Sequence, residues 1–476
     1  MKNIFKNQRI LFTLNRYTAY VIKFVQGLFI AKFLGPYYLG IWGLISVLLQ
    51  YFQYSSLGIQ YSLNVELSIN RHDPKSEYSG LVIYNSLLVN IFLGLFFILL
   101  SVVLYELKPE MLVRYDIIDL IIVIFSLGIL NNLSTIFINI YRSYDSFFKI
   151  GLNELTFNLI PFIFIFFFKD LELIRVLLYS MLALRIIHIL LFIYKFKFPI
   201  VFKLDNKLLV TLFKTGFLLM LINIGYNLFF MLIKTFVGKY YSVEEMGQFT
   251  FCFTITNAVV LGVQSFLFTM YSSILNEMAN DNSANKMILQ NINKKSIAYN
   301  YTVMILIMLV ISGLPILFMF FDKYKASYVT LIYILLAQAF FTAGTMHATY
   351  LFAKKQQIIL VKKTLSVSFV FLLIVFFLTQ QKVKLDYIGL IILIFSFFYA
   401  YVQILSSHRF LGVHFSLHLF IKDNIGYIPM VIIMSLFLFT IFANNMYILF
   451  AVFPIFIFFN YKSIIANFEE IKKILL

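Results

Sequence analysis

Long apolar stretches separated by short polar segments make up most of the chain. About fourteen such stretches follow one another, and roughly 20 apolar residues are enough for a helix to span the hydrocarbon core of a membrane. The predicted spans are 10–34, 38–66, 81–105, 117–141, 147–168, 172–194, 208–235, 243–275, 296–321, 327–352, 358–379, 386–406, 425–443 and 446–466. A β-barrel would instead show short segments of alternating polarity. The pattern therefore predicts an all-α, polytopic membrane protein with about fourteen transmembrane helices.

The pattern also repeats. The stretch F-L-G-P-Y-Y-L-G at 33–40 recurs as F-V-G-K-Y-Y at 236–241, and L-G-I-Q at 57–60 recurs as L-G-V-Q at 261–264. Each half of the chain up to about residue 408 holds six predicted spans. An even number of spans gives both copies the same orientation, so the repeat is parallel, about an axis along the membrane normal. We expect six-helix lobes in 1–203 and 204–408, and two extra transmembrane helices with a cytoplasmic tail in 409–476.

Four glycines mark the repeated segments: Gly35 and Gly40 in the first copy, Gly238 and Gly247 in the second. Glycine is typical of a tight turn, where the chain reverses within a few residues. Each glycine alone is typical of an ordinary membrane hairpin, and their paired recurrence is what indicates duplication. We interpret the four as structural residues of the outer turns.

Composition supports lipid as the main solvent. Hydrophobic residues make up 62% of the chain and charged residues 12%, whereas a soluble domain typically has about 45–50% and about 25%. The single cysteine, Cys252, excludes an intramolecular disulfide and a cysteine-based metal cluster. The basic segment 1–9 is not followed by a small-residue cleavage site, so the first apolar stretch is interpreted as a retained helix.

The net charge of +17 lies mostly in one set of loops. If the N-terminus is inside, the inner segments hold more than twice as many Lys and Arg residues as the outer loops. This positive-inside bias predicts a multi-pass protein of the cytoplasmic membrane with both termini in the cytoplasm. Such loops are attracted to anionic membrane lipids, and without a soluble basic domain no nucleic-acid partner is expected.

Cations outnumber acids within the predicted spans. A charge at the bilayer centre costs at least about 2.5–3.5 kcal/mol, so such residues usually face a cavity. Among the acids only Glu154 is clearly inside a span, with Glu66 and Asp119 near span ends. The cations are Arg16, Lys23, Lys32, Arg185, Lys214 and Lys234. The imbalance predicts a positive interior potential.

Two spans carry polar stripes that are candidates for substrate binding. Arg16 and Lys23 are seven residues apart and project from one face of the first span. The seventh span carries a similar stripe on one face, at spacings of four and seven residues: Asn223, Asn227 and Lys234. Since these are the matching first helices of the two copies, we expect them to wall a shared cavity. For Lys32, Lys214 and Lys234 the alternative is that the ammonium snorkels to the membrane interface.

Other titratable residues have weaker signals. Glu154 is a candidate proton or sodium site that couples transport, or alternatively a structural partner of Arg142 or Lys149. Histidine titrates near neutral pH, but an isolated histidine such as His188 or His347 is more typical of packing. In-span Asn and Gln residues are more typical of hydrogen bonds between helices. We predict no metal site and no cofactor.

Motifs of several enzyme classes are absent from the sequence. It has no G-x-x-x-x-G-K-[ST] loop for ATP, and no H-E-x-x-H or G-x-S-x-G motif. The chain is therefore not expected to be an enzyme.

The stretch F-L-G-P-Y-Y-L-G-I-W at 33–42, followed by S-S-L-G-I-Q-Y-S-L at 55–63, resembles the opening of bacterial Wzx-type polysaccharide flippases. These carry O-antigen or capsule repeat units and belong to the MATE-like exporters of the MOP superfamily, as do the lipid II flippases. The resemblance implies two six-helix lobes around a central cavity and alternating access. It also implies a polyprenyl-pyrophosphate-linked oligosaccharide as substrate, in cell-surface polysaccharide biosynthesis.

The same resemblance bears on the site. In lipid II flippases arginines of the first helix line the cavity, and Arg16 and Lys23 match that placement. Lys23 departs from the pattern because lysine acts as a point charge and cannot bind phosphate in the bidentate manner of arginine. The expected partners are the lipid-linked glycan, membrane lipids and other polysaccharide assembly proteins.

Two other functions remain open. A MATE-type cation-coupled multidrug antiporter would favour an acidic cavity, whereas the spans here are rich in cations. A membrane polysaccharide polymerase would usually carry a sizeable outer loop, and every predicted outer loop is short.

Overall fold

The structure of the protein is a computed structural model, which describes residues 8–69, 76–144, 147–194, 196, 198–280, 283–442 and 445–475. These residues form helices joined by short turns, with no strand among them. A helix pairs the backbone N–H and C=O groups within one segment, which lipid requires because it offers no hydrogen bonds. The prediction of an all-α fold is confirmed.

Helix contacts divide the chain into two compact units, Met1–Gly247 and Gln248–Leu476. The first unit holds α1 (Gln8–Phe52), α2 (Ile59–Ile69), α3 (Glu77–Leu107), α4 (Glu110–Arg114), η1 (Ile118–Leu120), α5 (Ile121–Ser143), α6 (Phe147–Phe164), α7 (Asp170–Ile193) and α8 (Asn206–Tyr240), and the start of α9 (Val243–Asn280). Helix α8 belongs here because it packs on α1 and α2.

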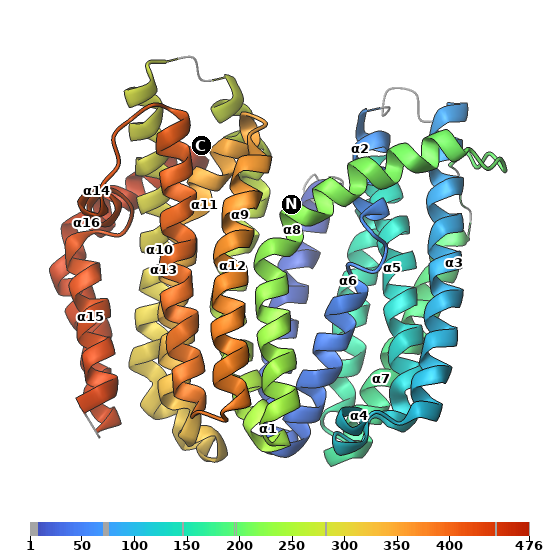
Figure 1. The fold of residues 1–476 in the computed structure, drawn as a ribbon, viewed down its shortest axis with the longest axis horizontal. Helices are drawn as coiled ribbons and strands as arrows, with labels where there is room; N and C mark the ends of the chain where they lie inside the picture. Colours follow the sequence, from blue (N-terminus) through green and yellow to red (C-terminus); the bar gives the residue numbers. More distant parts are fainter. Residues whose placement is uncertain are drawn as a thin grey trace. The chain divides into compact units, whose positions relative to one another are not determined.

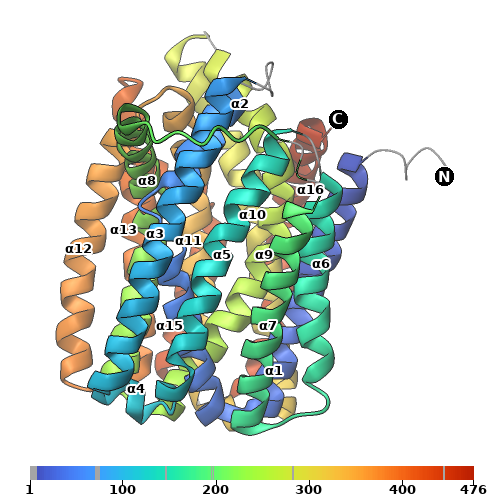
Figure 2. The same ribbon diagram turned by 90° about the vertical axis from the view of Figure 1, so that its right-hand side faces the viewer.

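Neighbouring helices of the first unit stand side by side (Figure 2). Helix α5 packs on α3 and α7, and α6 packs on α1 and α7. Buried side chains such as Val82, Ile136, Ile140 and Phe192 form a continuous core that reaches Leu212 of α8. This packing fixes the faces of α1, α5, α6 and α7 that carry polar residues.

The second unit holds the rest of α9, α10 (Asn285–Phe320), η2 (Asp322–Ser327), α11 (Tyr328–Ala353), α12 (Gln357–Gln380), α13 (Leu385–Phe410), α14 (Leu417–Asn424), α15 (Tyr427–Phe442), η3 (Met446–Ala451) and α16 (Val452–Leu475). Helix α11 is its centre and packs on α10 and α13. The segment Asp322–Ala353 contains an apolar stretch of 18 residues, and 94% of that stretch is buried inside the protein.

In the described part of the chain, ten helices are long and apolar enough to cross a membrane, or eleven if the bent pair α14 and α15 forms one span. The fourteen predicted spans count the two limbs of α1 separately, whereas the ten take α1 as one helix with a turn inside it. They also include α8 and α9, helices of 35 and 38 residues in which some side chains lie outside the described residues.

Of the four glycines predicted at the outer turns, Gly35 lies at a turn, inside α1, whereas Gly40, Gly238 and Gly247 lie within α1, α8 and α9. Gly35 has φ 67° and is followed by Pro36, and the helix on either side is regular. A positive φ of this kind is strained for residues other than glycine. Figures 1 and 2 show the result: α1 is a hairpin of two helical limbs, the second of which leads toward α2.

The second predicted span, 38–66, is not one continuous helix. It consists of the second limb of α1 and of α2, separated by turns at 53–58, where Leu57 and Gly58 have φ values of 50° and 89°. A methyl group at Gly58 would lie 2.1 Å from the carbonyl oxygen of Gly216 in α8. The break therefore lies where the backbones of two segments touch.

The helices after residue 409 dock on the core of the second unit. Ser312 of α10 donates to the carbonyl oxygens of Leu449 and Phe450, and Tyr301 of α10 donates to Asn460 of α16. Helices α14 and α15, which precede η3 and α16 in the chain, are bent by 101° relative to each other. Side-chain hydrogen bonds thus fix the C-terminal helices, in addition to apolar packing.

Candidate functional site

Lys23 is the described residue of the predicted cationic stripe on α1. Its side chain is exposed, and α1 packs directly on α6. The Glu154 carboxylate of α6 attracts the Lys23 ammonium electrostatically. The side chain of Arg16 lies outside the described residues, so its place in the stripe stays a prediction.

Arg185 of α7 is held by neutral oxygens from two neighbouring helices. Its Nε donates to Asn131 Oδ1 at 2.6 Å, and its Nη1 donates to Asn153 Oδ1 at 3.0 Å and to Ser134 Oγ at 3.3 Å. The guanidinium carbon lies 3.5 Å from the centre of the Phe157 ring, a cation–π contact. Arg185 is thus a fixed cation with few directions left for a ligand.

Glu154 of α6 interacts electrostatically with both of these cations. Its carboxylate attracts both Lys23 from α1 and Arg185 from α7. The partners considered from the sequence donate hydrogen bonds to other groups: Arg142 to Asn64 and Asn139. Lys149 donates to the Tyr141 hydroxyl and to the carbonyl oxygens of Leu191 and Tyr194, each at 2.9 Å. Lys23 and Arg185 are thus two cations, from the helices on either side, that interact electrostatically with Glu154.

Helix α8 contributes polar residues that face α1. Asn227 is exposed and hydrogen bonds the hydroxyl of Tyr54. About two turns further on, Lys234 is buried, and the Thr235 hydroxyl lies 2.9 Å from the Tyr51 hydroxyl. The side chain of Asn223 lies outside the described residues. Of the predicted stripe on α8, Asn227 is therefore exposed and Lys234 is buried.

The remaining in-span residues named from the sequence take simpler places. Lys32 and Lys214 are exposed. His188 is buried, with Nε2 at 2.8 Å from the Thr156 hydroxyl. His347 of α11 is fully buried between Ser407, 2.6 Å from Nδ1, and Asn424, 2.7 Å from Nε2. These histidines act as hydrogen-bonded packing residues.

The repeat glycines make reciprocal backbone contacts. A methyl group at Gly247 would lie 1.7 Å from the carbonyl oxygen of Pro36, and one at Gly40 would lie 1.9 Å from that of Val243. Gly40 and Gly247 are a matched pair of the repeat, and each approaches the backbone at the start of the helical segment that carries the other. Such exchanged contacts are what a two-fold axis between equivalent segments produces. They support the predicted duplication at the level of single residues.

Two residues near α4 cap the end of α8, and the sequence pattern gave no signal for them. Arg114 Nη2 donates to the carbonyl oxygens of Gly238 and Lys239, and the Tyr115 hydroxyl donates to Gly238 at 3.0 Å. A cation at a helix C-terminus is favourable because the free carbonyls carry partial negative charge. Burial raises the pKa of Tyr115 to about 12, so its hydroxyl remains a donor at ordinary pH.

Replacing Tyr115 by Phe removes one of these hydrogen bonds. We expect the free energy of unfolding to fall by about 1 kcal/mol, the net contribution of a typical hydrogen bond, because Arg114 still donates to the same carbonyl. Thermal denaturation of the purified protein measures the change. Tyr105→Phe, at an exposed tyrosine, is the matched control, and equal melting of both variants would contradict the role of the Tyr115 hydroxyl.

No family model matches the sequence, and no curated protein matches it. Solved structures do match. The lipid II flippase MurJ in an inward closed conformation has a TM-score of 0.67 at 14% identity, covering 96% of this chain and 100% of that one. An inward-facing MATE family multidrug resistance transporter of the MOP superfamily has a TM-score of 0.64 at 14% identity, covering 84% of this chain and 98% of that one.

A MOP superfamily transporter from Pyrococcus furiosus, described as having a binding pocket of reversed polarity, has a TM-score of 0.55 at 14% identity over 84% of this chain and 93% of that one. Identities this low establish the fold alone. The chain has the fold of the MOP superfamily transporters, which is the fold shared by MATE exporters and the lipid II flippase MurJ.

Proposed function

We propose that the protein is a flippase that moves polyprenyl-pyrophosphate-linked oligosaccharide repeat units across the cytoplasmic membrane by alternating access, for cell-surface polysaccharide biosynthesis. The fold supports this, since almost the whole chain aligns with the whole of a flippase for a lipid-linked substrate. A transporter of this kind needs no covalent chemistry, so the protein is not an enzyme in this proposal.

The place of Lys23 is the observation that carries the proposal: a cationic residue with an exposed side chain on α1, electrostatically linked to Glu154 of α6. A pyrophosphate that crosses a low-dielectric layer must lose water, and a nearby cation offsets that cost. Arg185 cannot take this part readily because its Nε and Nη1 are engaged by amide and hydroxyl oxygens. Lys23, together with Arg16, is therefore proposed to bind the pyrophosphate.

The amides on α8 suit the other part of the substrate. Asn227 is exposed on a helix that packs on α1, and amide groups can donate and accept hydrogen bonds with sugar hydroxyls. We propose that Asn223 and Asn227 contact the glycan, while the buried Lys234 adds positive charge. Membrane lipids and polysaccharide assembly proteins are the proposed partners.

Purified protein in liposomes that contain the lipid-linked oligosaccharide tests the function directly. We expect the glycan to become accessible to an impermeant lectin on the opposite leaflet faster than in protein-free liposomes. The same vesicles loaded with a cationic dye test the antiporter alternative, and mass spectrometry of the glycan tests the polymerase alternative. Dye export without flipping, or lengthened glycan, would replace the proposal by one of these.

Glu154 is proposed to couple substrate binding to protonation. Its carboxylate competes with the substrate anion for Lys23, so protonation of Glu154 favours anion binding, and by linkage anion binding favours protonation. The other described charged group that faces it is Arg185 of α7. We expect substrate affinity to rise by roughly fivefold or more as the pH falls, a typical coupling between sites.

Glu154→Gln should bind the substrate with an affinity that no longer depends on pH, since the carboxylate that titrates is gone. Binding of the fluorescent lipid-linked glycan at several pH values measures this. Glu172→Gln, at an exposed acid in the first turn of α7, should keep the wild-type pH dependence. If Glu154→Gln also keeps it, another group provides the coupling.

A further inference from the structure

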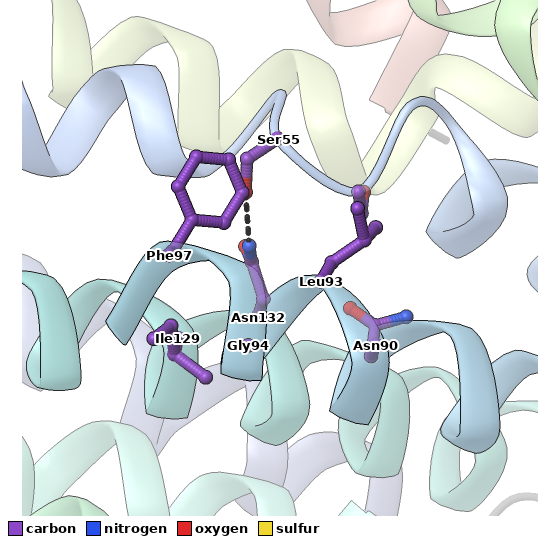
Figure 3. A pocket seen from close by; sticks show the side chains of 8 residues that line it. Ser55, Asn90, Leu93, Gly94, Phe97, Ile129 and Asn132 are labelled. Carbon is purple, nitrogen blue, oxygen red and sulfur yellow. Dashed lines mark hydrogen bonds between the residues drawn. The ribbon is translucent and has the colours of Figure 1, made fainter. Parts of the chain in front are cut away.

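A small polar cavity lies beneath the break between α1 and α2 (Figure 3). The broken segment, α3 and α5 enclose it. Its lining residues are Ser55, Ser56, Asn90, Leu93, Gly94, Phe97, Ile129 and Asn132. The centre of a water molecule can occupy about 10 Å³ of this cavity, which is roughly the space that a single water needs.

The amide of Asn132 fixes the broken segment above the cavity. Its Nδ2 donates to the carbonyl oxygen of Phe52 at 2.7 Å and to Ser55 Oγ at 2.9 Å, and Figure 3 shows Asn132 pointing up to Ser55. Asn90 lies on the next helix, and its Nδ2 donates to the carbonyl oxygen of Ser86 at 3.0 Å. The side-chain amides of Asn132 and Asn90 thus already donate hydrogen bonds to protein acceptors.

The hydroxyl of Ser56 is different. Ser56 is 1% exposed, and its Oγ has no hydrogen-bond partner among the described residues. Buried hydroxyls are nearly always paired with protein groups or ordered water, since an unpaired one retains its full desolvation penalty. A polar cavity of this size next to Ser56 supplies the place for such a water.

We infer that this cavity is a binding site for one buried water molecule, which hydrogen bonds Ser56 and the polar side chains around it. The eight lining residues include hydroxyl and amide groups but no carboxylate. A desolvated metal cation would therefore lack a counter-charge, whereas water can both donate and accept. Most backbone N–H groups of the turns at 53–58 donate to carbonyl oxygens three residues earlier. The water supplies the partner that the Ser56 hydroxyl lacks at this break.

The sign of one stability change tests the site. If Ser56 binds water, Ser56→Ala removes a hydrogen bond and lowers the melting temperature of the purified protein by a few degrees. If the hydroxyl is unpaired, the same change removes a buried, unsatisfied group and raises the melting temperature, which would overturn the inference. Ser86→Ala is the matched control, because Ser86 is also buried without a described partner but does not line the cavity; it should leave the melting temperature unchanged or raise it.

A second measurement does not depend on a folded Ser56 variant. Radiolysis in H₂¹⁸O produces hydroxyl radicals from bound water, and mass spectrometry then locates the ¹⁸O label. We expect labelling of Phe97 in the wild-type protein and a several-fold loss in Asn90→Leu, which fills the cavity with an apolar side chain, while labelling of the exposed Phe92 on the same helix stays unchanged. Equal Phe97 labelling in both proteins would overturn the inference. A higher melting temperature in NaCl than in choline chloride would also overturn the inference if Ser56→Ala abolished the difference, because the site would then bind a cation.

Discussion

Lys23→Ala is expected to lower the initial rate of glycan flipping at least tenfold, and Lys23→Glu to abolish it. A hydrogen bond to a charged group contributes about 1.5–3 kcal/mol, and tenfold corresponds to about 1.4 kcal/mol. Glutamate would place a second carboxylate beside Glu154, which already acts on this position. Lys23→Arg keeps the positive charge and should retain most of the rate. The measurement is lectin accessibility of the glycan in proteoliposomes.

Lys32 provides the matched control for this experiment. It is an exposed lysine on the same helix, nine residues further on, which is two and a half helical turns and therefore the opposite face. Lys32→Ala should flip glycan at the wild-type rate. The amount and melting temperature of each variant must match the wild type before rates are compared. If Lys23→Ala then flips glycan normally, the proposed binding site is wrong even where the flippase function stands.

Gly247→Ala is expected to destabilise the protein by about 3 kcal/mol or more, or to prevent its accumulation in the membrane. Overpacking costs typically about 1–3 kcal/mol and occasionally more, and here the new methyl group would lie 1.7 Å from the carbonyl oxygen of Pro36. That neighbour is backbone, so no side-chain rotation relieves the contact. Gly40→Ala meets the carbonyl of Val243 in the same way and should have an effect of similar size.

Gly313 separates this contact from a general effect of helix glycines. It lies within α10, and a methyl group there would meet nothing within 4 Å. Gly313→Ala should be neutral or stabilising, because alanine favours the helix by about 1 kcal/mol over glycine. Thermal denaturation and membrane yield measure all three variants. A Gly247→Ala protein that melts like the wild type would mean that α9 can move away from α1 at this contact without loss of stability.

The helices and the turn at Gly35 could be predicted because their signals are local. A long apolar stretch is helical in lipid, and Gly-Pro at the end of such a stretch marks a turn. The break at 53–58 is not predicted, because the polar residues Gln53, Ser55 and Ser56 are flanked on both sides by apolar residues and are included in one long span. It depends on Gly58 meeting the backbone of Gly216, which lies far along the chain and is invisible to a hydropathy pattern.

The site shows a similar division. Helical spacing was enough to single out Lys23, and its position on α1 does not depend on other segments. The partner of Glu154 was sought among cations near it in sequence, whereas Lys23 and Arg185 reach it through the packing of α1 and α7 on α6. Likewise, the sequence alone gave Asn131 and Asn153 no role beyond that of in-span amides, and only their hydrogen bonds with Arg185 show that they hold its guanidinium. The roles of Arg16 and Asn223 stay predictions.

The enclosure of α11 has a consequence for biogenesis. A new transmembrane helix first meets lipid on all sides, and α11 is apolar enough to be inserted on its own. In the finished protein its surface is covered by other helices, chiefly α10 and α13. Its contacts with lipid acyl chains must therefore be replaced by contacts with these helices after insertion. Substitutions in α11 should therefore change how much protein survives cellular quality control, and leave the turnover of each surviving molecule nearly unchanged.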